Sequence, residues 1–530
     1  MKFYPLSYGD RVSTKEYPHV LLYKDNWDDY HFKTTFVAEL WNSKNDIVRL
    51  GEVKILDLRL PPSRGRTELP DEFERLSDSF VSLGQAFTYY ELLQERGPGV
   101  YEPILEALQD VLYSPERQAA AREHPAFETS LLRAGSAERA LEDAPRLFWH
   151  GASGADEPSE LAFSFRTQVG GSSFDIGFTF GDTKHLPNRI NAVIGYNGVG
   201  KTTLLANLAM VASADQNRRA SADFQAQYGE LLENTDSVAF GSTIAVSYSA
   251  FDTFELPGGT REERLRVEKR GELFGYSYCG LRKFDDDLGG PDSPVDEEKR
   301  GGGEGAALKG SGEILDEFLR SLKLAQSESA RDILEAALST LALEPSFSDI
   351  GMQGFLDSSN DFDTARKELA RSSTGHKIVL NIVVQLVAHL QEKSLVLIDE
   401  PESHLHPPLL AALLRSVSVA LQRRDSFAVV ATHSPVVLQE IPRRHVRVLR
   451  RFGEITRVDL PEEETFGENI GFLTRTVFNL DSSQTDYHRV LNSLVQRFSL
   501  QEIEEMFDGA MSSQARAYVV GELRRRRANQ

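Results

Sequence analysis

The chain has 530 residues, a formal net charge of −21 at pH 7 and a single cysteine, Cys279. This length exceeds what one hydrophobic core supports and predicts two or three domains. The acidic balance excludes a basic surface over the whole molecule, and the lone cysteine excludes an intramolecular disulfide and a cysteine-built zinc site.

The chain start, MKFYPLSYGD, has no apolar segment of the kind that directs secretion. The longest nearly apolar run, 378–390, is too short to cross a bilayer and contains Asn381, Gln385 and His389, so it is typical of a buried helix. Together with the single cysteine, these features predict a cytoplasmic protein without a membrane segment.

Residues 1–150 are predicted to form an N-terminal accessory region that is rich in β-structure and then helical. Stretches of strand composition come first and one stretch with helical spacing follows: HVLLY (19–23), KTTFVAEL (33–40), VKILDLRL (53–60) and VYEPILEALQDVLY (100–113). The polar, glycine-containing segment 151–160 is predicted to be a joint.

Residues 156–460 are predicted to form an α/β core, and 461–530 a helical tail that ends in four arginines, Arg524–Arg527. The expected core elements are a hairpin (161–169 with 174–181), a strand (190–195), a helix from about 201, three strands (242–249, 394–398, 427–431) and a helix (408–423). An insert at about 283–345 begins with an acidic, glycine-rich segment, 283–312, which is predicted to be mobile, and continues as helix.

A phosphate-binding loop is indicated by GYNGVGKT, 195–202, which fits G-x-x-x-x-G-K-[ST] between an apolar strand and a helix. Its glycines leave the backbone N–H groups free to surround phosphates, and the helix N-terminus adds its positive end. Lys201 is expected to reach the β- and γ-phosphates, and Thr202 to ligate Mg²⁺. The other expected contacts come from Asn197, Gly198, Gly200 and Thr203.

A second apolar strand, SLVLI, ends in Asp399 and Glu400. Because chemistry in an open α/β sheet lies at the carboxyl ends of the strands, both carboxylates are predicted to lie beside the phosphate loop. Asp399 would hold the magnesium shell, and Glu400 would polarise the attacking water. A third strand, FAVVA (427–431), leads to His433, which would contact the γ-phosphate.

The stretch RSSTGHKIVL, 371–380, has the composition of a capped helix start. This stretch lies between the phosphate loop and the acidic strand. In residues and in position it resembles the signature LSGGQ of the ATP-binding-cassette (ABC) ATPases. Ser373, Thr374, Gly375 and His376 align with S-G-G-Q, and Ser372 replaces the leucine. The resemblance implies that Ser373 and Gly375 cap the γ-phosphate of an ATP held by a second subunit; the alternative is a simple capped helix.

The same resemblance implies a P-loop NTPase fold of the ABC-ATPase type, with a mostly parallel central sheet flanked by helices and an antiparallel β subdomain. IDEPESHLHP (398–407) followed by ATHSP (431–435) resembles the soluble, non-transporter branch. That branch includes SMC-like and RecF-like repair and chromosome ATPases and the AAA-family ATPases of anti-phage systems of the Septu and overcoming-lysogenisation-defect types.

The sequence departs from this family in two ways. No Q-loop glutamine follows the strand at 242–249, where Ser249 or Asp252 stands instead, and the separation of Lys201 from Asp399 leaves no room for long coiled-coil arms. For an adenine-stacking aromatic, only Phe174 and Phe178 are candidates.

The resemblance implies an ATP- and Mg²⁺-dependent ATPase that forms a head-to-head dimer and controls an effector, a separate nuclease, in prokaryotic anti-phage defence. The alternative is a repair or replication ATPase that binds nucleic acid directly through basic clusters at Arg443–Arg451 and Arg524–Arg527. A nuclease within the chain itself and a transporter subunit fit the motifs less well, because the tail lacks a paired acidic metal site and no membrane segment is present.

Overall fold

The computed structural model describes residues 1–7, 16–149, 160–181, 185–232, 238–250, 252–257, 264, 267, 271–273, 275–284, 306–357, 362–477 and 486–528. Residues 151–159 of the predicted joint and 285–305 of the predicted mobile segment lie outside the described residues. Met1–Gly467 form one compact unit and Glu468–Gln530 form another. No helix within the described ranges is long and apolar enough to cross a membrane.

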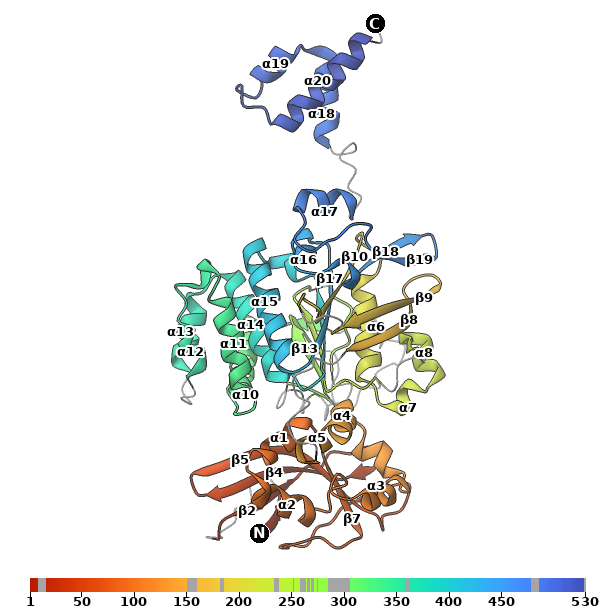
Figure 1. The fold of residues 1–530 in the computed structure, drawn as a ribbon, viewed down its shortest axis with the longest axis vertical. Coiled ribbons are helices and arrows are strands. Elements are labelled where there is room, and N and C mark those ends of the chain that lie inside the picture. The colour runs from red at the N-terminus through yellow and green to blue at the C-terminus, as the bar shows by residue number, and fades with distance from the viewer. Residues whose placement is uncertain are drawn as a thin grey trace. The chain divides into compact units, whose positions relative to one another are not determined.

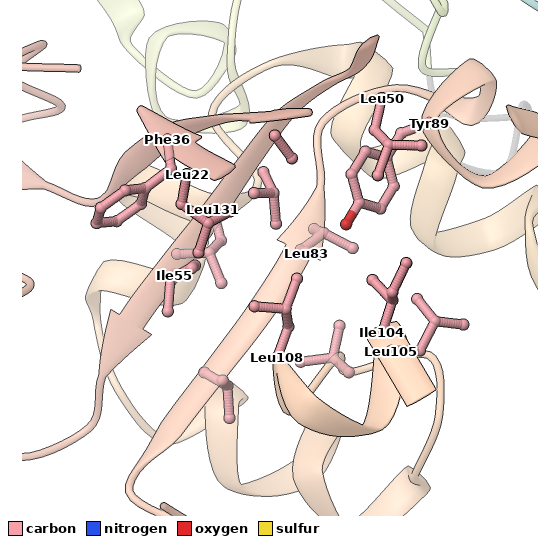
Figure 2. Packing of buried hydrophobic residues seen from close by; sticks show 14 of the residues in the cluster. Leu22, Phe36, Leu50, Ile55, Leu83, Tyr89, Ile104, Leu105, Leu108 and Leu131 are labelled. Carbon is pink, nitrogen blue, oxygen red and sulfur yellow. The ribbon is translucent and has the colours of Figure 1, made fainter. Parts of the chain in front are cut away.

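The N-terminal region is built on a five-stranded sheet with the strand order β1-β2-β4-β5-β7. Its strands are β1 (Lys2–Leu6), β2 (His19–Lys24), β4 (Thr35–Ser43), β5 (Asp46–Asp57) and β7 (Phe80–Gly84), with the short pair β3 (Phe32–Lys33) and β6 (Gly65–Arg66) beside them. The helices that follow are α1 (Phe87–Gln94), α2 (Pro98–Ala107), α3 (Pro115–Arg122), the π-helix η1 (Phe127–Leu131), α4 (Gly135–Asp143) and α5 (Pro145–Trp149). Apolar side chains of strands and helices form one core, to which Leu22, Ile55, Leu83, Ile104 and Leu131 all belong (Figure 2).

The helix predicted across 100–113 is wrong beyond its first part, because α2 ends at Ala107. Gln109 adopts a positive φ of 57°, and its side-chain amide donates to the carbonyl of Leu76. Asp110 is fully buried and accepts hydrogen bonds from the Tyr90 hydroxyl and from the Leu112 N–H. These tertiary contacts outweigh the helical spacing of the apolar residues.

The α/β core is built on a seven-stranded sheet with the strand order β13-β12-β16-β17-β10-β18-β19. In this sheet only β19 is antiparallel to its neighbour. Its strands are β10 (Ile190–Gly195), β12 (Thr243–Ser247), β13 (Tyr276–Gly280), β16 (Leu395–Asp399), β17 (Phe427–Thr432), β18 (Val446–Phe452) and β19 (Ile455–Asp459). Every residue of β12, β16 and β17 is buried. Such continuous apolar strands belong to a parallel sheet that is covered on both faces.

Helices cover this sheet on both sides. On one side lie α6 (Lys201–Ser213), α7 (Gln216–Arg219) and α8 (Ala222–Tyr228), together with a small antiparallel sheet of β11 (Glu230–Leu231), β8 (Leu161–Gln168) and β9 (Ser173–Phe180). The other helices, α10 (Ser311–Ala325), α11 (Arg331–Leu341), α14 (Thr374–His389) and α15 (Pro407–Arg423), lie side by side (Figure 1). The predicted α/β fold, with a mostly parallel central sheet flanked by helices and an antiparallel β subdomain, is confirmed.

Smaller elements complete the unit: the hairpin strands β14 (Arg282–Phe284) and β15 (Ala306–Leu308), the helices α12 (Gln353–Leu356), α13 (Asp363–Arg371) and α16 (Pro435–Gln439), and the 3-10 turns η4 (Pro345–Phe347), η5 (Pro401–His404) and η6 (Arg443–His445). The C-terminal unit contains α17 (Ile470–Thr476), α18 (Asp486–Arg497), α19 (Leu500–Glu505) and α20 (Ser513–Ala528). Leu491, Val495, Ile503 and Val519 form its small core.

Candidate functional site

The candidate site lies at the carboxyl edge of the parallel sheet. Ser247, at the end of β12, pairs in register with Asp399, and Asp399 pairs with Ala431 of β17. Ile194 of β10 pairs with Thr432. The residues that follow these four strands therefore meet at one edge, which is where ligands bind in open α/β sheets.

The phosphate loop joins β10 to α6 and has the backbone geometry that its glycines permit. Gly198 and Gly200 have φ values of 79° and 96°, in the left-handed region that other residues seldom adopt. A Cβ atom on Gly200 would also lie 2.0 Å from Cγ1 of Val169. Asn197 and Gly198 are exposed, and the first N–H groups of α6 have no intrahelical acceptor. The loop is therefore shaped to receive an anion at the helix N-terminus.

Lys201 and Thr202 occupy the first turn of α6. The ammonium group of Lys201 donates to the Gly195 carbonyl at 3.1 Å. Its side chain is buried, and burial lowers its pKa, while the charges of Glu400 and Asp399 act in the opposite direction. Thr203 is half-buried in the same turn. The loop thus holds one cation close to several carboxylates.

Thr202 and Asp399 form the contact that links the phosphate loop to the acidic strand. The Thr202 hydroxyl donates to Oδ2 of Asp399 at 2.9 Å, while Oδ1 of Asp399 is buried without a hydrogen-bond partner among the described residues. Burial raises the pKa of Asp399 to about 7, with a further rise from the charge of Glu400. A hydroxyl beside a carboxylate with an unpartnered buried oxygen is a donor set that fits Mg²⁺, which takes few protein ligands and fills its shell with water and phosphate oxygens.

Glu400 and His433 face each other across the ends of β16 and β17. Glu400 has a positive φ of 46°, and its N–H donates to the Ala431 carbonyl at 2.9 Å. Its Oε1 lies 3.5 Å from Nδ1 of His433. Both side chains are partly exposed, at 29% and 40%. Glu400 is therefore an accessible carboxylate beside an imidazole and next to the phosphate loop. Such a carboxylate can accept a proton from water.

Sequence analysis did not single out Glu402, although it completes this group. Its Oε1 accepts hydrogen bonds from the Thr432 hydroxyl at 2.8 Å and from the His433 N–H at 2.7 Å. The turn η5 carries Glu402 from β16 to the end of β17. The available signal was the third acid in DEPE, which lies three residues beyond the strand end.

The segment aligned with the ABC signature is the N-terminus of α14. Ser373 is its N-cap, and its hydroxyl accepts from the His376 N–H at 3.4 Å and contacts Nδ1 of His376 at 2.8 Å. Nε2 of His376 lies 3.1 Å from the Ser346 hydroxyl, and its ring packs edge-on against Phe347. Burial lowers the pKa of His376, which favours the neutral ring with one donor and one acceptor.

Within the described part of the chain, the hydrogen bonds of the Ser373 hydroxyl stay on its own helix. Ser373 is exposed, and Gly375 lies against Leu409 of α15, where an added Cβ would be 2.9 Å from Cδ1. The start of this helix is therefore accessible.

One Q-loop candidate, Asp252, and both candidates for adenine stacking have buried side chains. Asp252 is buried and bound by Arg282 and the Tyr278 hydroxyl, both at 2.7 Å. Phe174 and Phe178 belong to the hydrophobic core and are 8% and 1% exposed, so neither presents a ring face to a nucleotide.

The arginine clusters are used in part to hold the structure together. Arg447 donates to the Gly177 and Arg444 carbonyls, and Arg450 pairs with Asp459 at 3.6 Å. Arg525 pairs with Glu522 at 2.6 Å, and Arg526 donates to the Val495 carbonyl. Arg451 and Arg524 remain exposed.

A family model described as "AAA domain, putative AbiEii toxin, Type IV TA system" matches residues 313–439, which contain the signature-like segment, Asp399 and His433. Among solved structures, a nucleotide-free ATP-binding cassette from an ABC transporter shares 15% identity, with a TM-score of 0.28 over 60% of this chain and 98% of that chain. An SMC head bound to the C-winged helix domain of ScpA shares 12% identity, with a TM-score of 0.26 over 57% and 98%. UvrA2 from Deinococcus radiodurans shares 15%, with a TM-score of 0.27 over 61% and 40%.

One relative matches along nearly the whole length. Protein ea59 of Escherichia phage lambda is 30% identical over 541 residues, which cover 97% of this chain and 97% of ea59. A match of this extent includes the N-terminal region, the α/β core and the C-terminal unit. The chain belongs to the family of the phage lambda protein ea59.

Proposed function

We propose that the protein is a Mg²⁺-dependent ATPase that associates head to head on ATP and controls an effector, a separate nuclease, in prokaryotic anti-phage defence. The observation that carries the ATPase activity is the 2.9 Å contact between Thr202 and Asp399, which joins the phosphate loop to the acidic strand beside Glu400 and His433. The ABC-type fold supports ATP binding, and the chemistry of the site supports hydrolysis.

In this proposal the phosphate loop binds the nucleotide through the backbone of Asn197 to Thr203 and the ammonium group of Lys201. Thr202 and Asp399 would hold Mg²⁺, which would neutralise charge on the phosphates when bound. Glu400 would orient the attacking water and accept its proton. His433, whose Nδ1 lies 3.5 Å from Oε1 of Glu400, would donate a hydrogen bond to the γ-phosphate.

The dimer is proposed because the start of α14 resembles the ABC signature, which in that family caps the γ-phosphate of an ATP held by a second subunit. Ser373 and Gly375 begin a helix whose N-terminus is exposed and whose middle is buried. A helix N-terminus with a serine hydroxyl suits a phosphate held by another subunit. In that arrangement His376 donates from Nδ1 to Ser373, so that the serine hydroxyl is free to donate to the phosphate.

The ATPase activity is tested by measuring phosphate release from Mg-ATP by the wild type and by Lys201→Ala. We expect hydrolysis by the wild type and none by the variant, with binding of a fluorescent ATP analogue also lost in the variant. Thr203→Ser serves as a control that keeps a hydroxyl at a loop position next to the proposed metal ligand. Equal phosphate release by wild type and Lys201→Ala would refute the proposed site.

The defence role is supported by the resemblance of the DEPESHLHP and THSP segments to ATPases of anti-phage systems, and ea59 is itself a phage protein. The test is phage plating on cells that carry the gene in its native neighbourhood, with Glu400→Gln as the inactive control. Protection that depends on Glu400, with a nuclease recovered alongside the protein, is expected. Equal plating on both strains would refute the defence role and leave the ATPase activity standing.

A second candidate, a repair or replication ATPase that binds DNA directly, is favoured by the exposed Arg451 and Arg524. Salt-dependent DNA binding by the purified protein, weakened in Arg451→Ala and Arg524→Ala, would support it. The separate-nuclease proposal expects no such binding in the absence of the partner.

A further inference from the structure

The turn that follows β17 is held by one oxygen atom. Oε1 of Glu402 accepts from the hydroxyl of Thr432 and from the N–H of His433, at 2.8 and 2.7 Å. The Thr432 hydroxyl in turn accepts from the Ser434 N–H at 2.9 Å, and Ser434 is the N-cap of α16. The three residues that present the His433 ring are thus anchored through a single carboxylate.

The position of Glu402 is itself fixed. The N–H of Glu400 bonds to Ala431, and Pro401 begins the turn η5 with its restricted φ, so the chain crosses directly from β16 to the end of β17. The Glu402 side chain is only 12% exposed, and among the described residues its second oxygen, Oε2, is buried without a partner. Within that part of the chain, the hydrogen bonds of this carboxylate go to the turn.

The imidazole of His433 lies between two carboxylates. Nδ1 is 3.5 Å from Oε1 of Glu400, and Nε2 is 3.8 Å from Oε1 of Glu402. The second distance exceeds a hydrogen bond, whereas the backbone contact at 2.7 Å is a short one. Glu402 therefore acts on the position of His433 through the main chain more than through its ring.

We propose that Glu402 is a positioning residue, which holds the Thr432–His433 turn so that the His433 imidazole faces Glu400. This rests on the proposed ATPase function, in which Glu400 and His433 act on the attacking water and the γ-phosphate. A carboxylate at this place sets the distance between two catalytic groups without touching the nucleotide. An error of about 1 Å in such a distance costs on the order of 100-fold in rate.

The first test compares Glu402→Ala with Glu402→Gln in steady-state hydrolysis of Mg-ATP. We expect the alanine variant to lower kcat by about 10- to 100-fold with KM changed less than about threefold. The glutamine variant keeps an amide oxygen that accepts both hydrogen bonds, so it should recover most of the lost kcat. Thr432→Val, which removes one of the two donors, should lie between wild type and Glu402→Ala.

The second test asks whether Glu402 acts through His433. In a His433→Ala background, Glu402→Ala should add little to the loss of kcat, because the group that it positions is already absent. Multiplicative losses, or a glutamine variant as slow as the alanine variant, would overturn the proposal.

A spectroscopic measurement separates this inference from the proposed function. In a ¹³C-histidine-labelled protein, the His433 signal, assigned by its loss in His433→Ala, should shift or broaden in Glu402→Ala and return in Glu402→Gln. Wild-type protein without ATPase activity would refute the proposed function alone. An unchanged His433 signal in a folded Glu402→Ala variant would refute the positioning role alone.

Discussion

The two edges of the parallel sheet differ in how their charged side chains are paired. At the amino edge, the N-terminal region meets the turns before β16 and β17 through three ion pairs: Arg424–Glu91 at 2.8 Å, Lys393–Asp143 at 3.1 Å and Arg146–Glu392 at 2.9 Å. At the carboxyl edge, Asp399, Glu400 and Glu402 surround the one lysine of the phosphate loop, Lys201. One Asp399 oxygen there stays buried without a partner.

The difference in charge pairing separates a structural edge of the sheet from an edge suited to bind a cation and phosphates. Paired charges at the amino edge attach the N-terminal region to the base of the sheet. At the carboxyl edge the carboxylates outnumber the cations, and without a bound cation this lowers the free energy of unfolding. Such arrangements are typical of sites that bind a metal and phosphates. Substitutions at the two edges should therefore separate catalysis from stability.

The largest effect is expected for Glu400→Gln at the carboxyl edge. Loss of the proton acceptor should lower the rate of ATP hydrolysis by roughly 10²- to 10⁴-fold, with nucleotide binding retained. Phosphate release and binding of a fluorescent ATP analogue are the measurements. Thermal unfolding without nucleotide should change little, because Glu400 is partly exposed, and a marked drop in unfolding temperature would assign the residue to the scaffold instead.

Ser373→Arg tests the exposed helix start that the carboxyl edge of a second subunit would meet. The bulky cation should abolish ATP-driven association and hydrolysis while ATP binding persists. Sedimentation with and without ATP measures the association. Ser372→Ala is the matched control, since Ser372 is buried and its hydroxyl donates to the Glu368 carbonyl of the preceding helix, α13. Normal hydrolysis by Ser373→Arg would reduce the segment to a capped helix.

At the amino edge, Arg424→Ala should lower stability instead of rate. Arg424 is 6% exposed, pairs with Glu91 and also donates to the Ser329 carbonyl. Its loss leaves Glu91 and this carbonyl unsatisfied, at a cost of roughly 2–4 kcal/mol in the free energy of unfolding by urea.

The neighbouring residue supplies the control. Arg423 pairs with Asp332 at 3.1 Å, but both side chains are more than half exposed. Arg423→Ala should therefore cost less than about 1 kcal/mol. Equal urea midpoints for the two variants would contradict the account of the amino edge.

Glu392 gives a smaller, pH-dependent effect at the amino edge. Burial raises the pKa of Glu392 to about 7, and this effect is larger than the opposite effect of the Arg146 charge, which lowers the pKa. A carboxyl group whose pKa is higher in the folded state contributes stability below its unfolded pKa, near 4.5, and loses it as pH rises through 7. The full loss has an upper limit of about 3 kcal/mol.

Glu392→Gln should therefore flatten the decline in stability between pH 4.5 and 7 and leave the variant more stable than wild type at pH 8. Urea unfolding at several pH values measures this. Glu335→Gln, on the exposed face of α11, should follow the wild-type curve. A Glu392→Gln curve that parallels the wild type would show that this carboxylate is not desolvated.

The sequence predicted those parts of the molecule that depend on local patterns. The apolar strands, the hairpin of β8 and β9 and the start of α14 at Ser373 are readable because each combines periodicity with turn or capping residues. Thr202 and Asp399 lie 197 positions apart, yet Asp399 ends the buried strand β16, and Thr202 begins the helix after the glycine-rich loop that follows β10.

Other features depend on contacts that no local pattern contains. The end of α2 at Ala107 follows from Asp110 bonding to Tyr90, and the ion pair of Arg424 with Glu91 joins residues 333 positions apart. Glu402 was missed for a related reason: its partners are Thr432, at the end of the next strand, and His433, in the turn after it.

The most direct test of the central claim is the mass of Glu400→Gln in solution with and without Mg-ATP. This variant should bind ATP without hydrolysing it and so trap the associated state. We predict an increase from the monomer mass of 59.2 kDa to at least twice that value on addition of ATP, reversed in the Ser373→Arg background. A mass unchanged by ATP, together with no hydrolysis by the wild type, would contradict the account.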